Sequence, residues 1–236
     1  MIAKDTEQRS SAGKTAGIRG KADPGFDEYI QFVIDASIRR LIDPSLARAG
    51  QLLATTGIGA DAITIAGCLL GLMAALAVSF GRFYIALTLL IASRIADGLD
   101  GAVARATRLT DRGAFLDIVL DFFVYAIVPL GFAIWSPRTN AVPAALLLAS
   151  FLANGSAFLA FSIMAERRGM TTTRQGRKSI YYLAGIAEGF ETIAFMIAFC
   201  LFPGAFPVLA MAFAALCWIS AVGRLVLGWN LLATDA

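Results

Sequence analysis

Apolar residues in this chain come in blocks of about twenty, and a helix of about that length crosses the hydrocarbon core of a bilayer. Short polar connections separate the blocks, which fill almost the whole chain after residue 60. They predict six transmembrane helices, at residues 62–80, 83–104, 113–135, 141–164, 180–203 and 205–230. The expected fold class is therefore an all-α integral membrane protein, with residues 61–236 forming one six-helix domain.

The first 60 residues follow a different pattern. Residues 1–25 are polar and lack the apolar run of a signal peptide, so we expect a disordered tail. In residues 27–42, apolar side chains recur at helical spacing with charged residues between them. This predicts an amphipathic helix on the membrane surface, within a juxtamembrane segment of residues 26–60. A helix packed against the rest of the protein explains the pattern equally well.

Basic residues indicate which side of the membrane each connection faces. Of the twenty Lys and Arg residues, residues 1–61 hold eight, residues 105–112 hold three and residues 165–178 hold five. With six spans these three regions lie on the same side. Because Lys and Arg are enriched in cytoplasmic segments, both termini are predicted to face the cytoplasm, as in a plasma (inner) membrane protein.

The residue types that are missing limit the chemistry. The chain has no histidine, which excludes a Ser-His-Asp triad, His-ligated zinc and the usual haem ligation. The three cysteines are scattered through apolar segments, without the spacing of a metal or redox site. A net charge of +3 does not indicate a nucleic-acid partner. Carboxylates, basic groups, hydroxyls and the backbone remain.

The most charged stretch of the apolar region is residues 97–121, and its charges fall on two helix faces. Helical spacing places on the first face Asp97, Asp100, Gly101, Ala104 and Arg105. The same spacing places on the second face Gly113, Asp117 and Asp121. A short cytoplasmic connection makes these helices antiparallel neighbours. The two pairs of carboxylates are then expected at similar depths, with Asp97, Asp117 and Asp121 roughly 6 to 12 Å inside the hydrocarbon.

Ionised carboxylates at that depth are costly unless they are paired or bind metal. Ligands that are all oxygen favour Mg²⁺ or Mn²⁺, with one or two ions. The alternative is an ion-pair network with Arg94 and Arg105, although two guanidinium groups are fewer than four carboxylates. Gly101 and Gly113 either admit a bulky ligand to the backbone or let helices pack closely. Arg105, at the cytoplasmic end, suits a phosphate.

Residues 97–121 resemble the signature of the CDP-alcohol phosphatidyltransferase family, D-x2-D-G-x2-A-R followed by G-x3-D-x3-D, with all eight fixed positions filled. The resemblance implies that an alcohol attacks the β-phosphate of a CDP-linked substrate and releases CMP. It also implies two Mg²⁺ or Mn²⁺ ions held by Asp97, Asp100, Asp117 and Asp121, with Asp121 as candidate general base. A homodimer is expected from the same resemblance.

The resemblance further assigns residues to the CDP-linked donor. These are Asp61, Thr64, Gly101, Ala104, Arg105 and Gly113. Family members often have an asparagine where this chain has Asp61, which also suits a helix cap.

For the substrates we expect CDP-diacylglycerol as lipid donor and a small alcohol as acceptor, in phospholipid biosynthesis. A soluble CDP-alcohol with diacylglycerol as acceptor uses the same chemistry and stays open. From another class, a divalent-cation transporter would also place carboxylates in its spans, but the outer halves of these spans carry no acidic residues to continue a pathway.

A second group of charged residues is a candidate acceptor site: Arg108, Arg112, Lys178, Glu188 and Glu191. The basic members suit an acceptor phosphate, or they only follow the charge bias of cytoplasmic segments. The two glutamates lie within the fifth predicted span. They receive an amino or quaternary ammonium headgroup, or they pair with Arg94 or Arg224.

Overall fold

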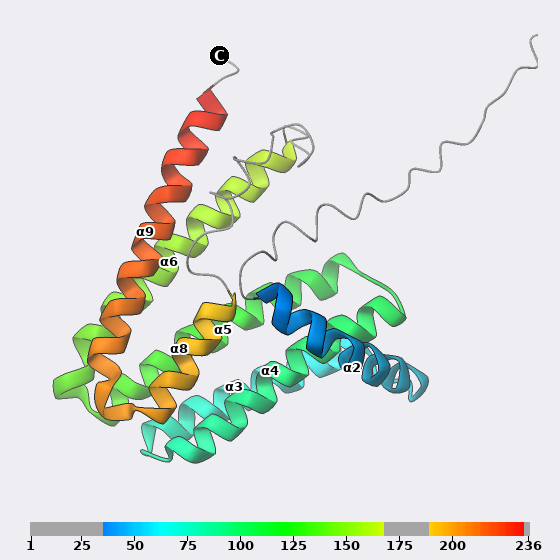
Figure 1. The fold of residues 1–236 in the computed structure, drawn as a ribbon, viewed down its shortest axis with the longest axis horizontal. Coiled ribbons are helices and arrows are strands. Elements are labelled where there is room, and N and C mark those ends of the chain that lie inside the picture. The colour runs from blue at the N-terminus through cyan, green and yellow to red at the C-terminus, as the bar shows by residue number, and fades with distance from the viewer. Residues whose placement is uncertain (1–34, 168–188, 234–236) are drawn as a thin grey trace, which may run out of the picture.

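The computed structural model describes residues 35–167 and 189–233, with side chains from residue 44 onward. Every regular element in these ranges is helical (Figure 1). In chain order the helices are α2 (Asp35–Thr55), α3 (Ala60–Ser79), α4 (Phe83–Ala106), α5 (Asp111–Trp135), α6 (Pro137–Arg167), α8 (Gly189–Leu201), the single 3₁₀ turn η2 (Pro203–Ala205) and α9 (Phe206–Leu232). The all-α fold class is confirmed.

Within the described residues, 4 helical segments are long and apolar enough to cross a membrane: α3, α5, α6 and the stretch Pro203–Leu232. Helix α4 is also long, at 24 residues, but it carries the charged groups Arg94, Asp97, Asp100 and Arg105. Helix α8 has only 13 described residues, because part of the predicted span 180–203 lies outside the described ranges. The protein is therefore a multi-pass α-helical membrane protein.

Short polar turns set the ends of the helices. The connection between α3 and α4 contains Gly81 at φ +70°, a backbone conformation that glycine adopts without steric cost. Between α4 and α5 the connection is residues 107–110, shorter than predicted. Helix α5 begins early because the hydroxyl of Thr110 caps it, accepting a hydrogen bond from the backbone N–H of Gly113 at 3.0 Å.

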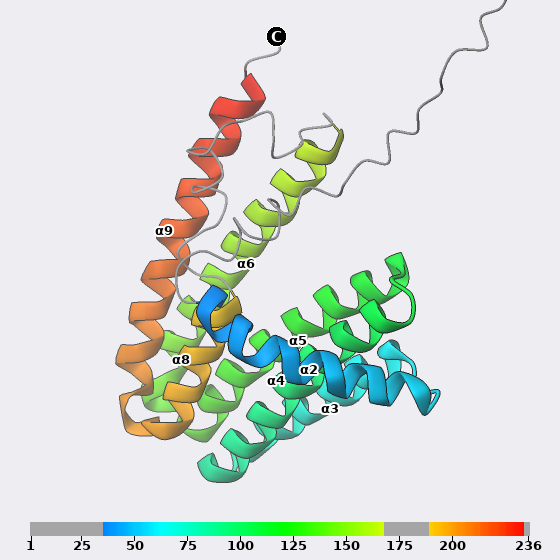
Figure 2. The ribbon, with the colours of Figure 1, turned by 45° about the vertical axis from the view of Figure 1, so that its right-hand side comes forward.

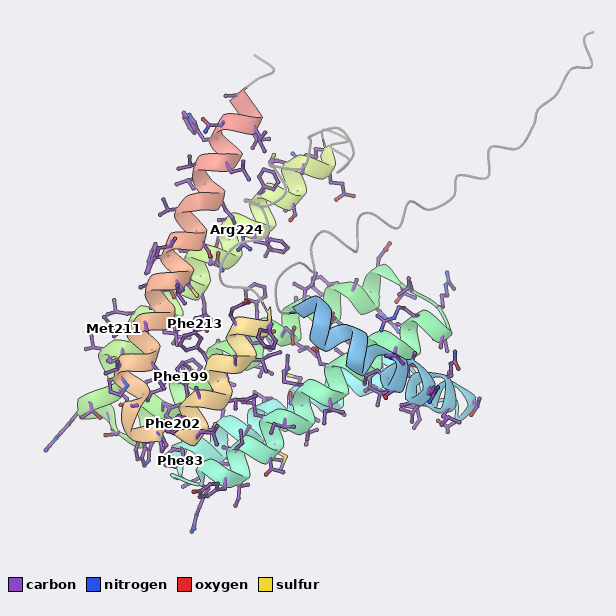
Figure 3. All side chains as sticks on the ribbon, in the orientation of Figure 1. Phe83, Phe199, Phe202, Met211, Phe213 and Arg224 are labelled. Atoms are coloured by element: carbon purple, nitrogen blue, oxygen red, sulfur yellow. The ribbon has the colours of Figure 1, made fainter. Side chains whose placement is uncertain are left out.

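The helices form two groups. Helix α3 packs against α4 and α5, whereas α6 packs along α9, and α8 touches both α4 and α9. Figures 1 and 2 show that the C-terminal ends of α6 and α9 diverge from the end of the first group where α4 connects to α5. Aromatic rings join the groups at the opposite end, where Phe132 of α5 stacks on Phe206 of α9, with centroids 4.4 Å apart. Phe199 of α8 lies edge-on to both rings (Figure 3).

Helix α2 packs against α4. A Cβ at Gly50 would lie 2.7 Å from the Cβ of Ala102, and a Cβ at Gly98 would lie 3.1 Å from Leu46. These contacts lie after the stretch 27–42 predicted as amphipathic, and helix α2 extends beyond that stretch to Thr55. The side chains of the predicted amphipathic stretch 27–42, and the predicted disordered tail 1–25, lie outside the described residues.

Candidate metal and substrate site

Three of the four signature aspartates converge. Asp97 of α4 and Asp117 and Asp121 of α5 each offer a carboxylate oxygen, and these oxygens all lie within 4.8 Å of one another. All three side chains are half-buried. The two helix faces derived from sequence spacing therefore do meet, because the four-residue connection forces α4 and α5 to run antiparallel.

The fourth aspartate, Asp100, lies beside this group on α4 and is only 5% exposed. Its Oδ2 atom is buried and has no hydrogen-bond partner among the described residues. An unsatisfied buried carboxylate oxygen costs free energy that a cation would recover. The four carboxylates offer only oxygen ligands, and one of those oxygens, Oδ2 of Asp100, lacks a hydrogen-bond partner among the described residues. Such a set fits a hard divalent ion such as Mg²⁺ or Mn²⁺.

A small cavity of about 10 Å³ opens at the carboxylates, enough for roughly one water-sized occupant. Helices α3, α4 and α5 line it with Thr64, Gly67, Cys68, Ser93, Arg94, Asp97, Asp117, Leu120 and Asp121. Thr64 was predicted from the sequence as a donor-binding residue. Its place in the cavity wall brings α3 into the site.

Arg94 belongs to the cluster as well. Its Nη1 donates to Oδ1 of Asp121 at 2.7 Å and lies 3.6 Å from Oδ2 of Asp97. Its Nη2 donates to Oγ of Ser93 at 3.2 Å, and Ser93 in turn donates to the backbone oxygen of Gly67 on α3 at 2.7 Å. Arg94 therefore forms ion pairs with the aspartates, as the alternative of an ion-pair network predicted. Arg105 takes part in none of the ion pairs between described residues.

Tyr125 completes the surroundings of Asp121. Its hydroxyl donates to Oδ2 of Asp121 at 3.2 Å, and its ring lies 5.7 Å from the Arg94 guanidinium carbon. Sequence reasoning named Arg94 only in the ion-pair alternative and did not assign Tyr125 to the site. Helical spacing carried a signal for both, since Arg94 precedes Asp97 by three residues and Tyr125 follows Asp121 by four.

An ion pair between Asp61 and Arg112 joins the first turn of α3 to the first turn of α5. The Arg112 side chain is 84% exposed, so the arginine of this pair lies at the protein surface. Asp61 does not cap α3, whose N-cap is Gly59 without a side-chain hydrogen bond. A Cβ at Gly113 would lie 3.3 Å from Oδ1 of Asp61, so a glycine here leaves space beside the Asp61 carboxylate.

Gly101 has a different environment. The three nearest heavy atoms outside the local helix backbone, for a Cβ built there, all belong to the guanidinium of Arg105, on the same helix. No neighbouring helix in the described part of the chain packs on this glycine, so the close-packing alternative does not explain it. Ala104 is half-buried on the same face of α4, and Arg105 and Arg108 are exposed at its end.

The candidate acceptor residues are described only in part. Lys178 and Glu188 lie outside the described residues. Glu191 is half-buried in the first turn of α8. Arg224 of α9 is buried, donates to Oδ1 of Asn154 at 2.6 Å and lies 5.3 Å from the Phe158 ring centre (Figure 3).

Residues 58–227 match the family described as CDP-alcohol phosphatidyltransferase. The chain is 40% identical over 197 residues to inner membrane protein YnjF of Escherichia coli, covering 84% of this chain and 96% of that protein. It is 29% identical over 199 residues to the archaetidylinositol phosphate synthase of Methanothermobacter thermautotrophicus, covering 82% and 91%.

Among solved structures, the fold resembles the Mycobacterium tuberculosis phosphatidylinositol phosphate synthase PgsA1 with CDP-DAG bound. The TM-score is 0.63 at 22% identity, covering 78% of this chain and 94% of that one.

Proposed function

This chain belongs to the CDP-alcohol phosphatidyltransferase family, and from that membership we propose that it transfers the phosphatidyl group of CDP-diacylglycerol to a small alcohol and releases CMP. It is an enzyme of phospholipid synthesis. The observation that carries the proposal is the convergence of Asp97, Asp117 and Asp121 within 4.8 Å, inside a membrane domain. A lipid donor keeps its acyl chains in the bilayer and its headgroup at the membrane interface, while the acceptor arrives from the cytoplasm. A site just below the cytoplasmic surface can contact both.

The four signature aspartates would hold two Mg²⁺ or Mn²⁺ ions. When bound, such ions neutralise the pyrophosphate charge and stabilise CMP as leaving group. Asp121 is the proposed general base for the acceptor hydroxyl. Arg94 and Tyr125 each donate a hydrogen bond to one of its oxygens and so hold the Asp121 carboxylate in place.

The cytidine and its phosphates are proposed to lie along the C-terminal turns of α4 and the start of α3. Gly101, Ala104 and Arg105 would contact the donor from α4. Asp61 and Thr64 would contact it from the start of α3, and Gly113 from the start of α5. The acceptor is proposed to bind nearby through Arg108, Arg112, Lys178, Glu188 and Glu191.

The proposed topology has six spans, in which α4 and a complete 180–203 helix join the four apolar segments. Both termini and the active site then face the cytoplasm, with residues 27–42 as an amphipathic helix at the surface, within the juxtamembrane segment 26–60. The likeness to an inner membrane protein of E. coli supports the same membrane for this chain. A homodimer is proposed by family resemblance.

The test is incubation of the purified protein with CDP-diacylglycerol and a panel of acceptors, followed by lipid mass spectrometry. Inositol phosphate leads the panel because a relative is an archaetidylinositol phosphate synthase; glycerol 3-phosphate and amino alcohols follow. A new phospholipid, with CMP released only in the presence of Mg²⁺ or Mn²⁺, supports the proposal. A product formed only from a soluble CDP-alcohol and diacylglycerol reverses the donor. Ion flux in liposomes without CMP release indicates a transporter instead.

Gly101→Leu is expected to impair donor binding without unfolding the protein. A side chain there would meet only the flexible tip of Arg105, so the helix packing stays intact. On the proposed function it would fill space needed by the cytidine phosphates and raise the KM for CDP-diacylglycerol by about 10-fold or more, the cost of losing one or two ordinary polar contacts. Initial rates over a donor titration, beside a melting curve, measure both effects. A lowered melting temperature with unchanged KM would contradict the expectation.

A further inference from the structure

Arg94 is a buried cation placed among residues that are proposed to bind cations. Its side chain is only 10% exposed, and it lines the same cavity as Asp97, Asp117 and Asp121. Its shortest contact, 2.7 Å, joins Nη1 to Oδ1 of Asp121, one of the three converging carboxylates. A positive charge at that distance repels a divalent cation held by the same carboxylates. Arg94 therefore opposes metal binding at Asp121.

The arginine is anchored on one side only. Nη2 is held by Ser93, which is itself tied to the backbone of Gly67 on α3. The Nε atom is buried and has no hydrogen-bond partner among the described residues. A guanidinium that served packing alone would be expected to satisfy that donor. Its position is therefore set by attraction to the carboxylates.

Three contacts remain for the guanidinium once Asp121 is released. Oδ2 of Asp97 lies 3.6 Å from Nη1. Ser93 stays within reach of Nη2, and the face of Tyr125 lies 5.7 Å from the guanidinium carbon, within the range of a cation–π contact. The side chain thus has a place to withdraw to, without leaving the cavity and without exposing its charge to lipid.

Charge balance shows what this arrangement does. Four aspartates and one arginine leave three negative charges, which two divalent ions exceed by one. The pyrophosphate of the donor supplies two more negative charges and restores the need for both cations. If the proposed function is correct, Arg94 disfavours binding of two metal ions to the donor-free site. Binding of both ions becomes favourable when the pyrophosphate of the donor is present.

We propose that Arg94 is an internal counter-cation, which holds Asp121 and Asp97 in the metal-free protein and yields Asp121 when a divalent ion binds. Arg94 is then a positioning residue that lowers the affinity of the donor-free site for metal. The inference rests on the proposed function, because it requires the aspartates to be the metal site.

The experiment compares Mn²⁺ binding to the detergent-purified full chain and its variants, without donor or acceptor, by electron paramagnetic resonance of free Mn²⁺. Arg94→Gln removes the charge and keeps an amide donor on a shorter side chain. It should bind Mn²⁺ about 5-fold or more tightly than the wild type, since a unit charge beside the ion opposes its binding. It should also melt at a lower temperature in EDTA and recover more stability on adding Mn²⁺.

Two further variants make the comparison specific. Arg94→Lys keeps the charge but loses the second donor that Ser93 anchors, so we expect Mn²⁺ affinity about 2-fold above the wild type. Arg224→Gln is the matched control, because Arg224 is also a buried arginine on a long apolar helix but is not among the residues that line the carboxylate cavity. Its Mn²⁺ affinity should equal that of the wild type even if it melts earlier.

Each outcome separates the two hypotheses. Mn²⁺ affinity that is unchanged or weakened in Arg94→Gln overturns the role of Arg94 and leaves the proposed function standing. If that variant does not fold, Arg94→Lys decides, and affinity at or below that of the wild type overturns the inference. A wild type that binds no Mn²⁺ overturns the metal site on which both rest.

Discussion

Asp117→Asn is expected to lower CMP release about 100-fold or more while the protein stays folded in detergent, because the loss removes a proposed direct metal ligand. Asp117 contributes one of the three converging carboxylate oxygens, and asparagine has nearly the same shape but no charge. Removing one of several crowded negative charges also relieves repulsion, so folding should not suffer. Asp97→Asn should behave in the same way. Turnover is measured with CDP-diacylglycerol at saturating Mg²⁺.

Asp111→Asn is the matched control for this prediction. Asp111 lies on the same helix, six residues before Asp117, but it is exposed in the first turn of α5. Its replacement should leave turnover within about 2-fold of the wild type, as expected for a surface substitution. Turnover near that of the wild type in Asp117→Asn would exclude the carboxylate cluster as the metal site and, with it, the proposed mechanism.

Gly131→Ala is expected to destabilise the protein by about 2 kcal/mol or more, and to lower the melting temperature by about 5 °C or more. Gly131 lies on α5 where this helix crosses α3. A Cβ there would lie 2.6 Å from the backbone oxygen of Ala75 and 3.2 Å from the Cβ of Val78. The oxygen belongs to a helix backbone and cannot move aside without separating the two helices. Thermal unfolding in a single detergent measures the effect.

Gly223→Ala provides the comparison within the same protein. Gly223 is also on a long apolar helix, α9, but outside its own helix backbone no atom of the described residues lies within 4 Å of a Cβ built there. Alanine favours a helix over glycine by about 1 kcal/mol, so this variant should melt at the wild-type temperature or slightly above it. Equal melting temperatures for the two variants would mean that α3 and α5 are not in close contact at Gly131.

Local features of the sequence were sufficient to predict the helices. Helix α3 was expected at residues 62–80 and is Ala60–Ser79; α5 was expected at 113–135 and is Asp111–Trp135. The length of an apolar block is a sum over neighbouring residues, so it needs no knowledge of the rest of the fold. The convergence of Asp97, Asp117 and Asp121 was predictable for a similar reason. Helical periodicity places the aspartates on one face of α4 and one face of α5, and the short connection makes these two helices neighbours.

The contacts around the aspartates depended on the tertiary structure. The Asp61–Arg112 pair joins residues 51 positions apart, and Arg94 reaches Asp121 across 27 positions. Gly101 and Gly131 look alike in the sequence, yet one faces a guanidinium tip and the other a helix backbone. Such differences follow from the rotation and depth of each helix relative to its neighbours. Side-chain packing between helices sets these quantities, and no local pattern along one helix contains them.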